Sequence, residues 1–550
     1  GCMSQKLFSI CNIIAEKEED YKTVLEYLGN YPISVLNKFP EELYFSVPTL
    51  SIGWNFIKNK FPKQNIFNKE ISKNLFWSFS KSEEEKEFKN EIESFFIKSV
   101  KEWLPSDFKV FDSYINSESL EVFFKENINK EKKLFVFFHE GALYAYNDNN
   151  NFIINIKSLS AVHSNFRDLI TNILNEYETI SFSYNNFYGY INLDKIGDII
   201  AIDSLRWVKY GVETPESYFN IIPNFAIHKY IPFLMNKLNP IELDSEEKEF
   251  YKRMCQRDKI TCWLSHREIA FTKEFDNKKL NFKTRRDFKL SKINYSNKRT
   301  ITGRIAARDG YNPQNLERES GERRDIISRF NDGKILVFDY VSFETKIALY
   351  LSEDKEFIEE YYNEDLHYET AIVLFDTPDI TKEQRDFSKI FNHSLLYGAG
   401  EDTLLKKLST YFNNPEEQLY KIKVLLKPII DKAEEIKTNF KENEYIINPW
   451  GSIIKSNKAH ASFNNYIQSF ASEIVVDKLI EIREFLRPYK TEFLFQVHDS
   501  LVFDLHPSEQ FLMGKISTIL SHHKNMFFGM SYSFGPNYQD LEEADDIMSE

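Results

Sequence analysis

Between Arg385 and Gly398 the chain reads RDFSKIFNHSLLYG, in which a polar or aromatic residue with useful chemistry returns at every fourth position. These residues are Arg385, Lys389, His393 and Tyr397. Four steps along an α-helix turn the chain by about 400°, so the series drifts by only about 40° per step and forms one slanted stripe. The segment is therefore predicted to be a helix with two cations, an imidazole and a phenol on one face. Such a stripe suits a row of phosphate groups, although a solvated helix face gives the same pattern.

Composition describes an ordinary globular protein. Of the 550 residues, 42% are hydrophobic and 28% are charged. The length is sufficient for three or four domains. No apolar run approaches the roughly eighteen residues of a membrane span, and the N-terminus lacks a signal pattern, so we expect no membrane partner and a cytoplasmic or equivalent location. Cys255 and Cys262 have no pattern of a metal site, and we expect ordinary helix residues there.

Charge is unevenly distributed. The net charge is −14, which argues weakly against a nucleic-acid partner, yet the window from Lys273 to Arg308 holds twelve Lys or Arg and only three acids. Such a window is a candidate surface for a phosphate backbone. A flexible charged linker is the alternative, but apolar residues such as Phe275, Phe282 and Leu290 interleave with the charges. We therefore expect a structured surface.

Two aspartates stand at positions that regular structure would hold rigidly. In KILVFDYVSFETKIALYLS, a strand over 335–338 delivers Asp339 and is followed by helical spacing over 343–351. In EFLFQVHDSLVFDL, two strands over 493–497 and 501–505 flank a tight turn with Asp499 at its tip. A turn aspartate usually only shapes the turn. A rigidly mounted pair, however, can bind two Mg²⁺ ions about 3.5 to 4 Å apart, the arrangement used in nucleotidyl transfer.

In this order and spacing the segments resemble the motifs of the family A DNA polymerases, the bacterial polymerase I and T-odd phage type. Asp339-Tyr340 with Glu344 resembles motif A, the stripe from Arg385 to Gly398 resembles motif B, and Val497-His498-Asp499 resembles motif C. Three further segments resemble parts of the family that contact DNA or nucleotide: TGRIAARDGYNPQN at 302–315, Asp365-Leu366-His367, and FNNYIQSFASEIV with Asn464 and Gln468. The resemblance covers about residues 300 to 540.

The resemblance implies an enzyme that extends a primer with dNTPs on a DNA template, using two Mg²⁺ ions for which Mn²⁺ can substitute. It implies that Asp339 and Asp499 are the catalytic metal ligands, with the Tyr340 carbonyl as a further ligand. The dNTP would contact Arg385, Lys389, His367, Tyr397, Glu344 and His393, and Glu344 would exclude a 2′-hydroxyl. Primer or template would contact Arg304, Gln314, Asn315, Asn464, Gln468, Gln496 and His498, which would read acceptors common to all base pairs. Each of these positions also has an ordinary interpretation as a surface polar residue.

Two positions depart from the family pattern. Motif C usually carries Glu after its Asp, and here Ser500 follows. Because Mg²⁺ retains several non-protein oxygens, we expect weaker metal binding without loss of activity, and Ser500→Glu should leave or raise the rate. His393 stands where the family has Phe or Tyr beside the deoxyribose, so we expect unusual discrimination against dideoxynucleotides.

The segment from Lys133 to about Leu238 resembles, more weakly, the family's 3′-5′ exonuclease domain. That chemistry needs about four carboxylates around two metals. Only Glu140 is retained, while Phe138, Gly189 and His228 stand where acids belong. The resemblance therefore implies a structural domain and no intrinsic proofreading.

The expected fold is α/β (α+β): a right-hand polymerase with palm, fingers and a short thumb, preceded by an RNase H-like exonuclease-type domain and a helical N-terminal module. The expected domains are a module of unknown role at 1–125, the degenerate exonuclease-like domain at 126–240, the thumb at 241–300, and palm and fingers at 301–550, with the fingers at about 345–445. A short thumb suggests low processivity without a processivity factor, and a helicase or a separate exonuclease are further possible partners. A phage-like or organellar origin would place the protein in a bacterial or phage-infected cell or in an organellar matrix. Two alternatives stay open: a single-subunit RNA polymerase-like enzyme and a catalytically silent replisome scaffold.

Overall fold

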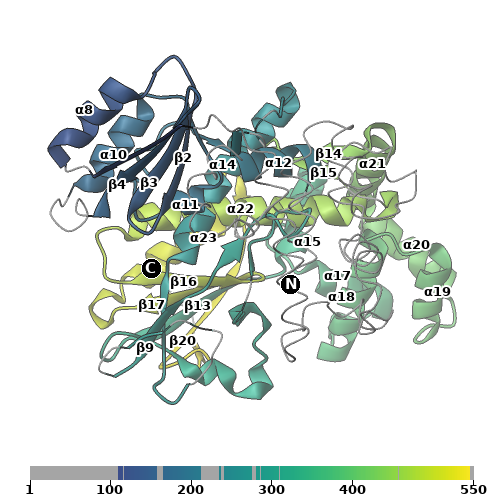
Figure 1. Cartoon of the computed structure of the whole chain (residues 1–550). Coiled ribbons are helices and arrows are strands. Elements are labelled where there is room, and N and C mark those ends of the chain that lie inside the picture. The colour runs from purple at the N-terminus through teal and green to yellow at the C-terminus, as the bar shows by residue number, and fades with distance from the viewer. Residues whose placement is uncertain are drawn as a thin grey trace, which may run out of the picture. The chain divides into compact units, whose positions relative to one another are not determined.

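The computed structural model of the chain describes residues 109–114, 117–157, 165–211, 235–236, 239, 241–275, 280, 282–284, 287–308, 310–455 and 458–544. The chain divides into two compact units, Gly1–Cys255 and Gln256–Glu550 (Figure 1). Most of the module predicted at 1–125 lies outside the described residues. The finer division into four domains stays a prediction.

In the first unit a six-stranded mixed sheet has the order β1-β4-β3-β2-β5-β6. Strands β2, β3 and β4 form antiparallel pairs, and the outer pairings are parallel. Strand β2 reads LFVFFH and is almost wholly buried, as expected for a central strand. The strands are β1 (Lys109–Tyr114), β2 (Leu134–His139), β3 (Ala142–Asn147), β4 (Asn150–Asn155), β5 (Thr179–Ser181) and β6 (Ile200–Ala201). The described helices of the unit, before α14, are α8 (Ser117–Asn127), α10 (Phe166–Asn175), α11 (Tyr184–Phe187) and α12 (Ile202–Tyr210). An RNase H-like identity for this sheet stays a prediction.

The second unit begins within the long helix α14 (Ser245–Ser265), which contains the boundary between the units. A small antiparallel sheet has the order β12-β7-β9-β8, and β10 pairs with β11. Phe271 stacks on Phe275 with ring centroids 5.0 Å apart, and Phe282 packs edge-on against both. The described part of the basic window is thus structured, as its interleaved aromatic residues predict. The elements are β7 (Glu268–Phe271), β8 (Lys283–Thr284), β9 (Lys289–Lys292), β10 (Tyr295–Ser296), β11 (Ala306–Ala307), β12 (Ile326–Ile327) and the 3₁₀ turns η2 (Pro313–Asn315), η3 (Arg318–Ser320) and η4 (Glu322–Asp325).

An antiparallel sheet of order β16-β17-β13-β20-β21 carries the predicted strands (Figure 1). The hairpin expected around Asp499 is confirmed as β16 and β17, and the strand-to-helix transition after Asp339 is confirmed as β13 and α15. The elements of this region are β13 (Lys334–Tyr340), α15 (Phe343–Leu351), η5 (Ala459–Ala461), α22 (Ser462–Leu486), β16 (Glu492–Val497), β17 (Ser500–Leu505), η6 (Pro507–Glu509), α23 (Leu512–Ser521), β18 (His522–His523), β19 (Met526–Phe527), β20 (Met530–Gly535) and β21 (Glu542–Glu543).

Helices dominate residues 355 to 443. The predicted stripe lies on α18 (Lys382–Leu396), which begins with a capping box formed by Thr381 and Gln384. Tyr397 is the residue that caps the C-terminal end of α18. The other elements are α16 (Lys355–Tyr361), α17 (Leu366–Phe375), α19 (Glu401–Ser409), α20 (Pro415–Leu425), α21 (Lys427–Asn443), and the hairpin β14 (Tyr445–Ile447) and β15 (Ile453–Lys455). The predicted mixed α/β class is confirmed.

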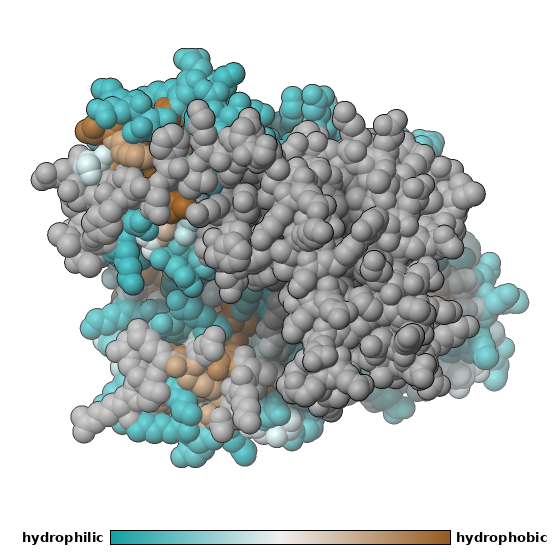
Figure 2. Space-filling model, in the orientation of Figure 1, coloured by the Kyte–Doolittle hydropathy of each residue, from teal (hydrophilic) through white to brown (hydrophobic). Residues whose placement is uncertain are grey.

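On the face drawn in Figure 2, hydrophilic residues cover most of the coloured area, and apolar residues show only in small patches. Among the described helices, none has both the length and the apolar composition needed to cross a bilayer. Cys255 and Cys262 lie on α14, in agreement with the prediction that they are ordinary helix residues.

Candidate active site

Two aspartates meet at the end of the central sheet. Asp339 is the penultimate residue of β13, and Asp499 lies in the turn between β16 and β17. The backbone N–H of Tyr340 donates to the carbonyl of Asp499 at 2.9 Å, so the two acidic residues belong to adjoining backbone segments. The sheet therefore brings together the two residues that the sequence predicts as catalytic.

The electrostatics of Asp499 fit a group that receives positive charge. Its side chain is accessible to solvent. Nevertheless, the protein that crowds around it, and then the Glu344 carboxylate, raise the pKa of Asp499 to about 6, and Asp339 adds to the repulsion. Arg304 and His498 act in the opposite direction. A bound cation would relieve this repulsion.

The donor set agrees with a hard divalent cation. Carboxylate and carbonyl oxygens are the ligands that Mg²⁺ prefers, and Asp339, Asp499 and the Tyr340 carbonyl are of this kind. Within the described ranges, no group of three or more His, Cys, Asp or Glu side chains is placed to enclose a metal ion. Two aspartates would leave coordination positions to water and substrate oxygens, as Mg²⁺ requires in phosphoryl-transfer sites.

Glu344 joins three distant segments of the chain. It lies in the first turn of α15, directly after a bend at Ser342 with φ of 49°. Its Oε1 accepts from Arg304 Nη2 at 3.3 Å, and its Oε2 accepts from the Tyr397 hydroxyl at 3.1 Å. Burial, and then the Glu344 charge, raise the pKa of the Tyr397 phenol. The three side chains, predicted separately, thus form one connected group beside Asp499.

The stripe on α18 lies against α17 for part of its length. Arg385 Nε donates to Asp365 Oδ2 at 2.6 Å, and Asp365 also caps α17. Lys389 is exposed. The His393 ring lies 5.5 Å from the rings of both His367 and Tyr397. Burial, and then the Lys389 charge, lower the pKa of His393, so this imidazole is neutral at pH 7.

His367, which the resemblance places near the triphosphate, is buried in this structure. It is 1% exposed, and its Nε2 lies 3.2 Å from Thr345 Oγ1, while its Nδ1 lies 3.1 Å from Asn392 Nδ2. Burial lowers its pKa to about 4. Both ring nitrogens thus have protein partners, and contact with a phosphate, which stays a prediction, would require the imidazole to leave at least one of them.

The predicted DNA-contact residues divide into two groups. Gln314 uses its amide internally: Nε2 donates to the carbonyls of Ile305 and Gln496 at 3.0 and 2.9 Å, and Oε1 accepts from Ala307 N at 3.2 Å. Gln496 Nε2 donates to the His498 carbonyl at 2.5 Å. These two glutamines therefore hold the backbone in this structure, and their contacts with DNA stay predictions.

The other predicted DNA-contact residues keep some exposure. Asn315 and His498 are exposed, and His498 has a φ of 51° at the hairpin tip. Asn464 and Gln468 are hydrogen-bonded to each other at 3.1 Å on α22. An i, i+4 pair of this kind lies on one helix face. Both amides retain atoms that can hydrogen-bond to a ligand.

Two buried ion pairs lie near Arg304 and the basic window, and the sequence patterns do not predict them. Arg257 on α14 pairs with Glu473 on α22 and also donates to the Gly303 carbonyl, next to Arg304. Lys298, counted above as part of the basic surface, is instead buried and paired with Asp258 at 2.5 Å. Lys298 is therefore a structural cation. Since these partners are far apart in sequence, no local pattern identifies them.

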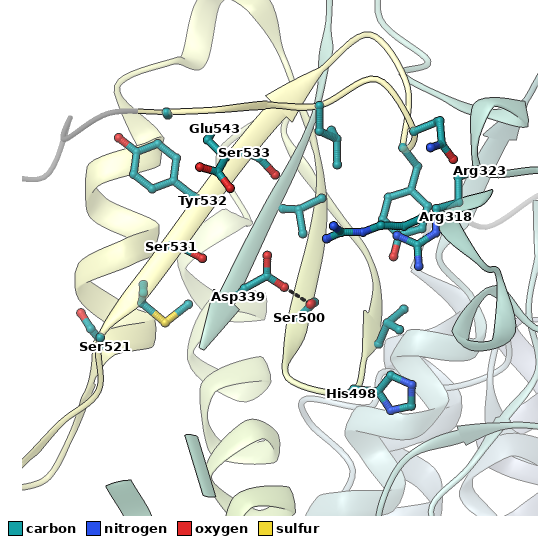
Figure 3. Close-up of a pocket in the computed structure, with 18 of the residues that line it drawn as sticks. Arg318, Arg323, Asp339, His498, Ser500, Ser521, Ser531, Tyr532, Ser533 and Glu543 are labelled. Atoms are coloured by element: carbon teal, nitrogen blue, oxygen red, sulfur yellow. Dashed lines mark hydrogen bonds between the residues drawn. The ribbon is translucent and has the colours of Figure 1, made fainter. Parts of the chain in front are cut away.

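A cavity of about 940 Å³ opens beside Asp339 (Figure 3). Ser531 and Ser533 of β20 line it on one side of Asp339. Ser500, Arg318 and Arg323 line it on the other side. Arg323 donates to the Leu316 carbonyl and lies over the Tyr538 ring. Asp339 thus borders an open cavity.

Three of the exonuclease-like positions, Phe138, Glu140 and Gly189, lie in the part of the chain that the structure describes, and they form no comparable group there. Phe138 is buried between Phe187 and Tyr190, and Glu140 projects from the turn after β2 with its side chain 83% exposed. Gly189 has a φ of 89° and accepts a hydrogen bond from Arg167. His228 lies outside the described residues.

Comparison with known proteins agrees with this geometry. The sequence profile of DNA polymerase family A matches residues 243–539, more than half of the chain. DNA polymerase I of Caldicellulosiruptor bescii is 27% identical in an alignment of 237 positions that covers 40% of this chain and 28% of that protein. DNA polymerase I of Bacillus subtilis is 24% identical in an alignment of 267 positions that covers 44% of this chain and 30% of that protein. Each match spans less than a third of the relative's length.

Among solved structures, the POL domain of Pol1 from M. smegmatis, in complex with DNA primer-template and dNTP, shares the fold with a TM-score of 0.58 at 14% identity. The match covers 78% of this chain and 99% of that chain. The fold is that of a right-hand polymerase domain. The chain belongs to DNA polymerase family A.

Proposed function

We propose that this protein is a DNA-directed DNA polymerase that extends a primer 3′-hydroxyl with dNTPs. Family membership supports the reaction class, and the matched structure is a complex with DNA primer-template and dNTP. The observation that carries the proposal is the meeting of Asp339 and Asp499 on adjoining backbone segments, next to the group formed by Glu344, Tyr397 and Arg304.

Asp339 and Asp499, with the Tyr340 carbonyl, would hold two Mg²⁺ ions. When bound, such ions lower the pKa of the attacking hydroxyl and offset charge on the leaving pyrophosphate. Arg385 and Lys389 would bind the triphosphate electrostatically, which is the main form of catalysis in phosphoryl transfer. Since Arg385 pairs with Asp365 here, the nucleotide would have to replace that partner.

Nucleotide choice rests on Glu344 in this proposal. Its carboxylate is held at both oxygens, by Arg304 and by Tyr397, so it is fixed in position beside Asp499. A fixed carboxylate would leave no room for a 2′-hydroxyl. Tyr397 and His393 would border the base and the sugar, while the exposed or partly exposed Asn315, Asn464, Gln468 and His498 would contact primer or template.

Extension assays with dNTPs alone and rNTPs alone test this proposal against an RNA polymerase-like enzyme. We expect extension with dNTPs, and we expect Glu344→Ala to improve rNTP use by roughly 10- to 200-fold in relative kcat/KM, the usual scale of steric selection. Tyr397→Phe is the matched control, because it removes only one hydrogen bond to Glu344. Efficient use of rNTPs by the unmodified protein would favour the RNA polymerase alternative.

We also propose that the protein lacks intrinsic proofreading. The support is the apolar packing of Phe138 and the exposed position of Glu140, whose nearest charged partner is the neighbouring His139 at 3.5 Å. A mismatched primer should stay intact when it is incubated with protein and Mg²⁺ without dNTPs. Degradation that disappears in Glu140→Ala would contradict the proposal.

Short extension products in the presence of a DNA trap would support low processivity and a requirement for a processivity factor.

A further inference from the structure

Ser500 occupies the position after the catalytic aspartate of the hairpin, where it meets Asp339. The register of β13 and β17 places Ser500 directly opposite Asp339. The Ser500 hydroxyl donates to Asp339 Oδ1, as the dashed line in Figure 3 shows. The residue that breaks the family pattern therefore contacts the predicted metal ligand directly.

The backbone explains this contact. Because Tyr340 N donates to the Asp499 carbonyl, Tyr340 and Asp499 form a hydrogen-bonded pair of the antiparallel ladder. The next pair, Asp339 and Ser500, is then of the non-hydrogen-bonded type, in which Cα atoms approach to about 4.5 Å and side chains are closest. A short side chain at this point can reach the carboxylate without leaving its preferred rotamer.

The other neighbour of Asp339 provides a contrast. Ser531 of β20 is the register partner of Asp339 on the opposite side. Val341 N donates to the Gly529 carbonyl, which makes the Asp339–Ser531 pair the hydrogen-bonded type, with Cα atoms about 5.5 Å apart. The two flanking serines are thus chemically alike but differ in how closely they approach the carboxylate.

We propose that Ser500 is a positioning residue for the metal site, an inference that rests on the proposed function. Its hydroxyl occupies one lone pair of Asp339 Oδ1 and fixes the rotation of the carboxylate, which leaves the other lone pairs for a cation. Hydrogen bonds of this kind to ligating carboxylates typically change metal affinity 10- to 100-fold. A serine also avoids adding a further negative charge to a cluster in which Asp339 and Glu344 already repel Asp499.

The test measures Mn²⁺ binding by electron paramagnetic resonance, using the full chain with template, a dideoxy-terminated primer and the next dNTP. Ser500→Ala should raise the Mn²⁺ Kd about 10- to 100-fold. Ser500→Thr, which keeps the hydroxyl, and Ser531→Ala, the matched control, should bind as the unmodified protein does. Excess metal should restore most of the extension rate of Ser500→Ala.

Equal Mn²⁺ affinity in Ser500→Ala and the unmodified protein would overturn the inference and leave the polymerase proposal intact. So would equal losses in Ser500→Ala and Ser500→Thr, since these would indicate a role in packing and not in hydrogen bonding. If the unmodified complex binds Mn²⁺ no better than Asp339→Asn, the proposed function itself fails.

Discussion

Arg385 on α18 is paired with Asp365, the residue that caps α17, with Nε and Oδ2 2.6 Å apart. The arginine expected to bind a triphosphate is therefore already neutralised by a neighbouring carboxylate. Both side chains are about one-third exposed, at 31% and 37%. The pair thus lies where an incoming anion has access to it.

Removing this competition should favour nucleotide binding. Asp365→Asn keeps a side chain suited to capping and deletes the charge, so we expect KM for dNTPs to fall by up to about fivefold, the scale of a partly exposed ion pair. Asp365→Ala should in addition lose about 1 kcal/mol of stability with the cap. Steady-state kinetics and thermal unfolding measure the two effects. A higher KM in Asp365→Asn would mean that Asp365 orients Arg385 for binding and does not compete for it.

Asp499 should make stability depend on pH. Its pKa is raised from the ordinary 3.8 to about 6, so between these values the folded protein binds a proton more tightly than the unfolded chain does. The contribution of this group to stability is then greatest below about pH 4 and is lost as pH rises through 6. Asp499→Asn should raise Tm at pH 8, with a smaller gain at pH 4.5, while extension activity is lost. An equal rise in Tm at both pH values would contradict the raised pKa of Asp499.

His393 is expected to affect sugar discrimination. Its neutral ring has hydrogen-bonding capacity that phenylalanine lacks, and it can contact the nucleotide whether or not a 3′-hydroxyl is present. The unmodified protein should therefore accept ddNTPs better, relative to dNTPs, than His393→Phe does. A difference of about fivefold corresponds to about 1 kcal/mol, the value of one net hydrogen bond. Identical ratios of ddNTP to dNTP incorporation in the two proteins would show that His393 has no role in sugar discrimination.

Gln314 should behave as a structural residue. Its amide makes three hydrogen bonds to backbone atoms, including one to β16. Gln314→Ala should lower the unfolding free energy by about 1–3 kcal/mol, because it leaves backbone groups unpaired. The exposed Asn315→Ala should change it by less than about 0.5 kcal/mol. A fully stable Gln314→Ala variant with weakened DNA binding would favour the direct contact suggested by sequence resemblance.

Local patterns in the sequence predicted the elements that hold the site. The spacing from Arg385 to Tyr397 identified α18, and the apolar runs on either side of Asp499 identified the β16–β17 hairpin. These two predictions are confirmed because helical and strand periodicities are properties of consecutive residues. The meeting of Asp339 with Asp499 required the family resemblance as well, since strand pairing is not encoded locally.

Such patterns do not predict which groups an individual side chain contacts. Burial of His367 against Thr345 and Asn392 depends on the packing of α17 against α18 and α15. Lys298 belongs to a run of cations in the sequence, whereas in the structure it is buried and paired with Asp258 on α14. Tertiary contacts decide whether a polar residue faces a ligand or the protein, and composition alone does not.

Primer extension by the unmodified protein and by Asp339→Asn is the most direct test of the central claim. With a labelled primer, a DNA template, Mg²⁺ and four dNTPs, we expect template-dependent extension that Asp339→Asn reduces by at least about 10³-fold. Equal DNA binding by both proteins would show that the variant is folded. Absence of extension by the unmodified protein, or full activity in Asp339→Asn, would contradict the assignment of a polymerase site at Asp339 and Asp499.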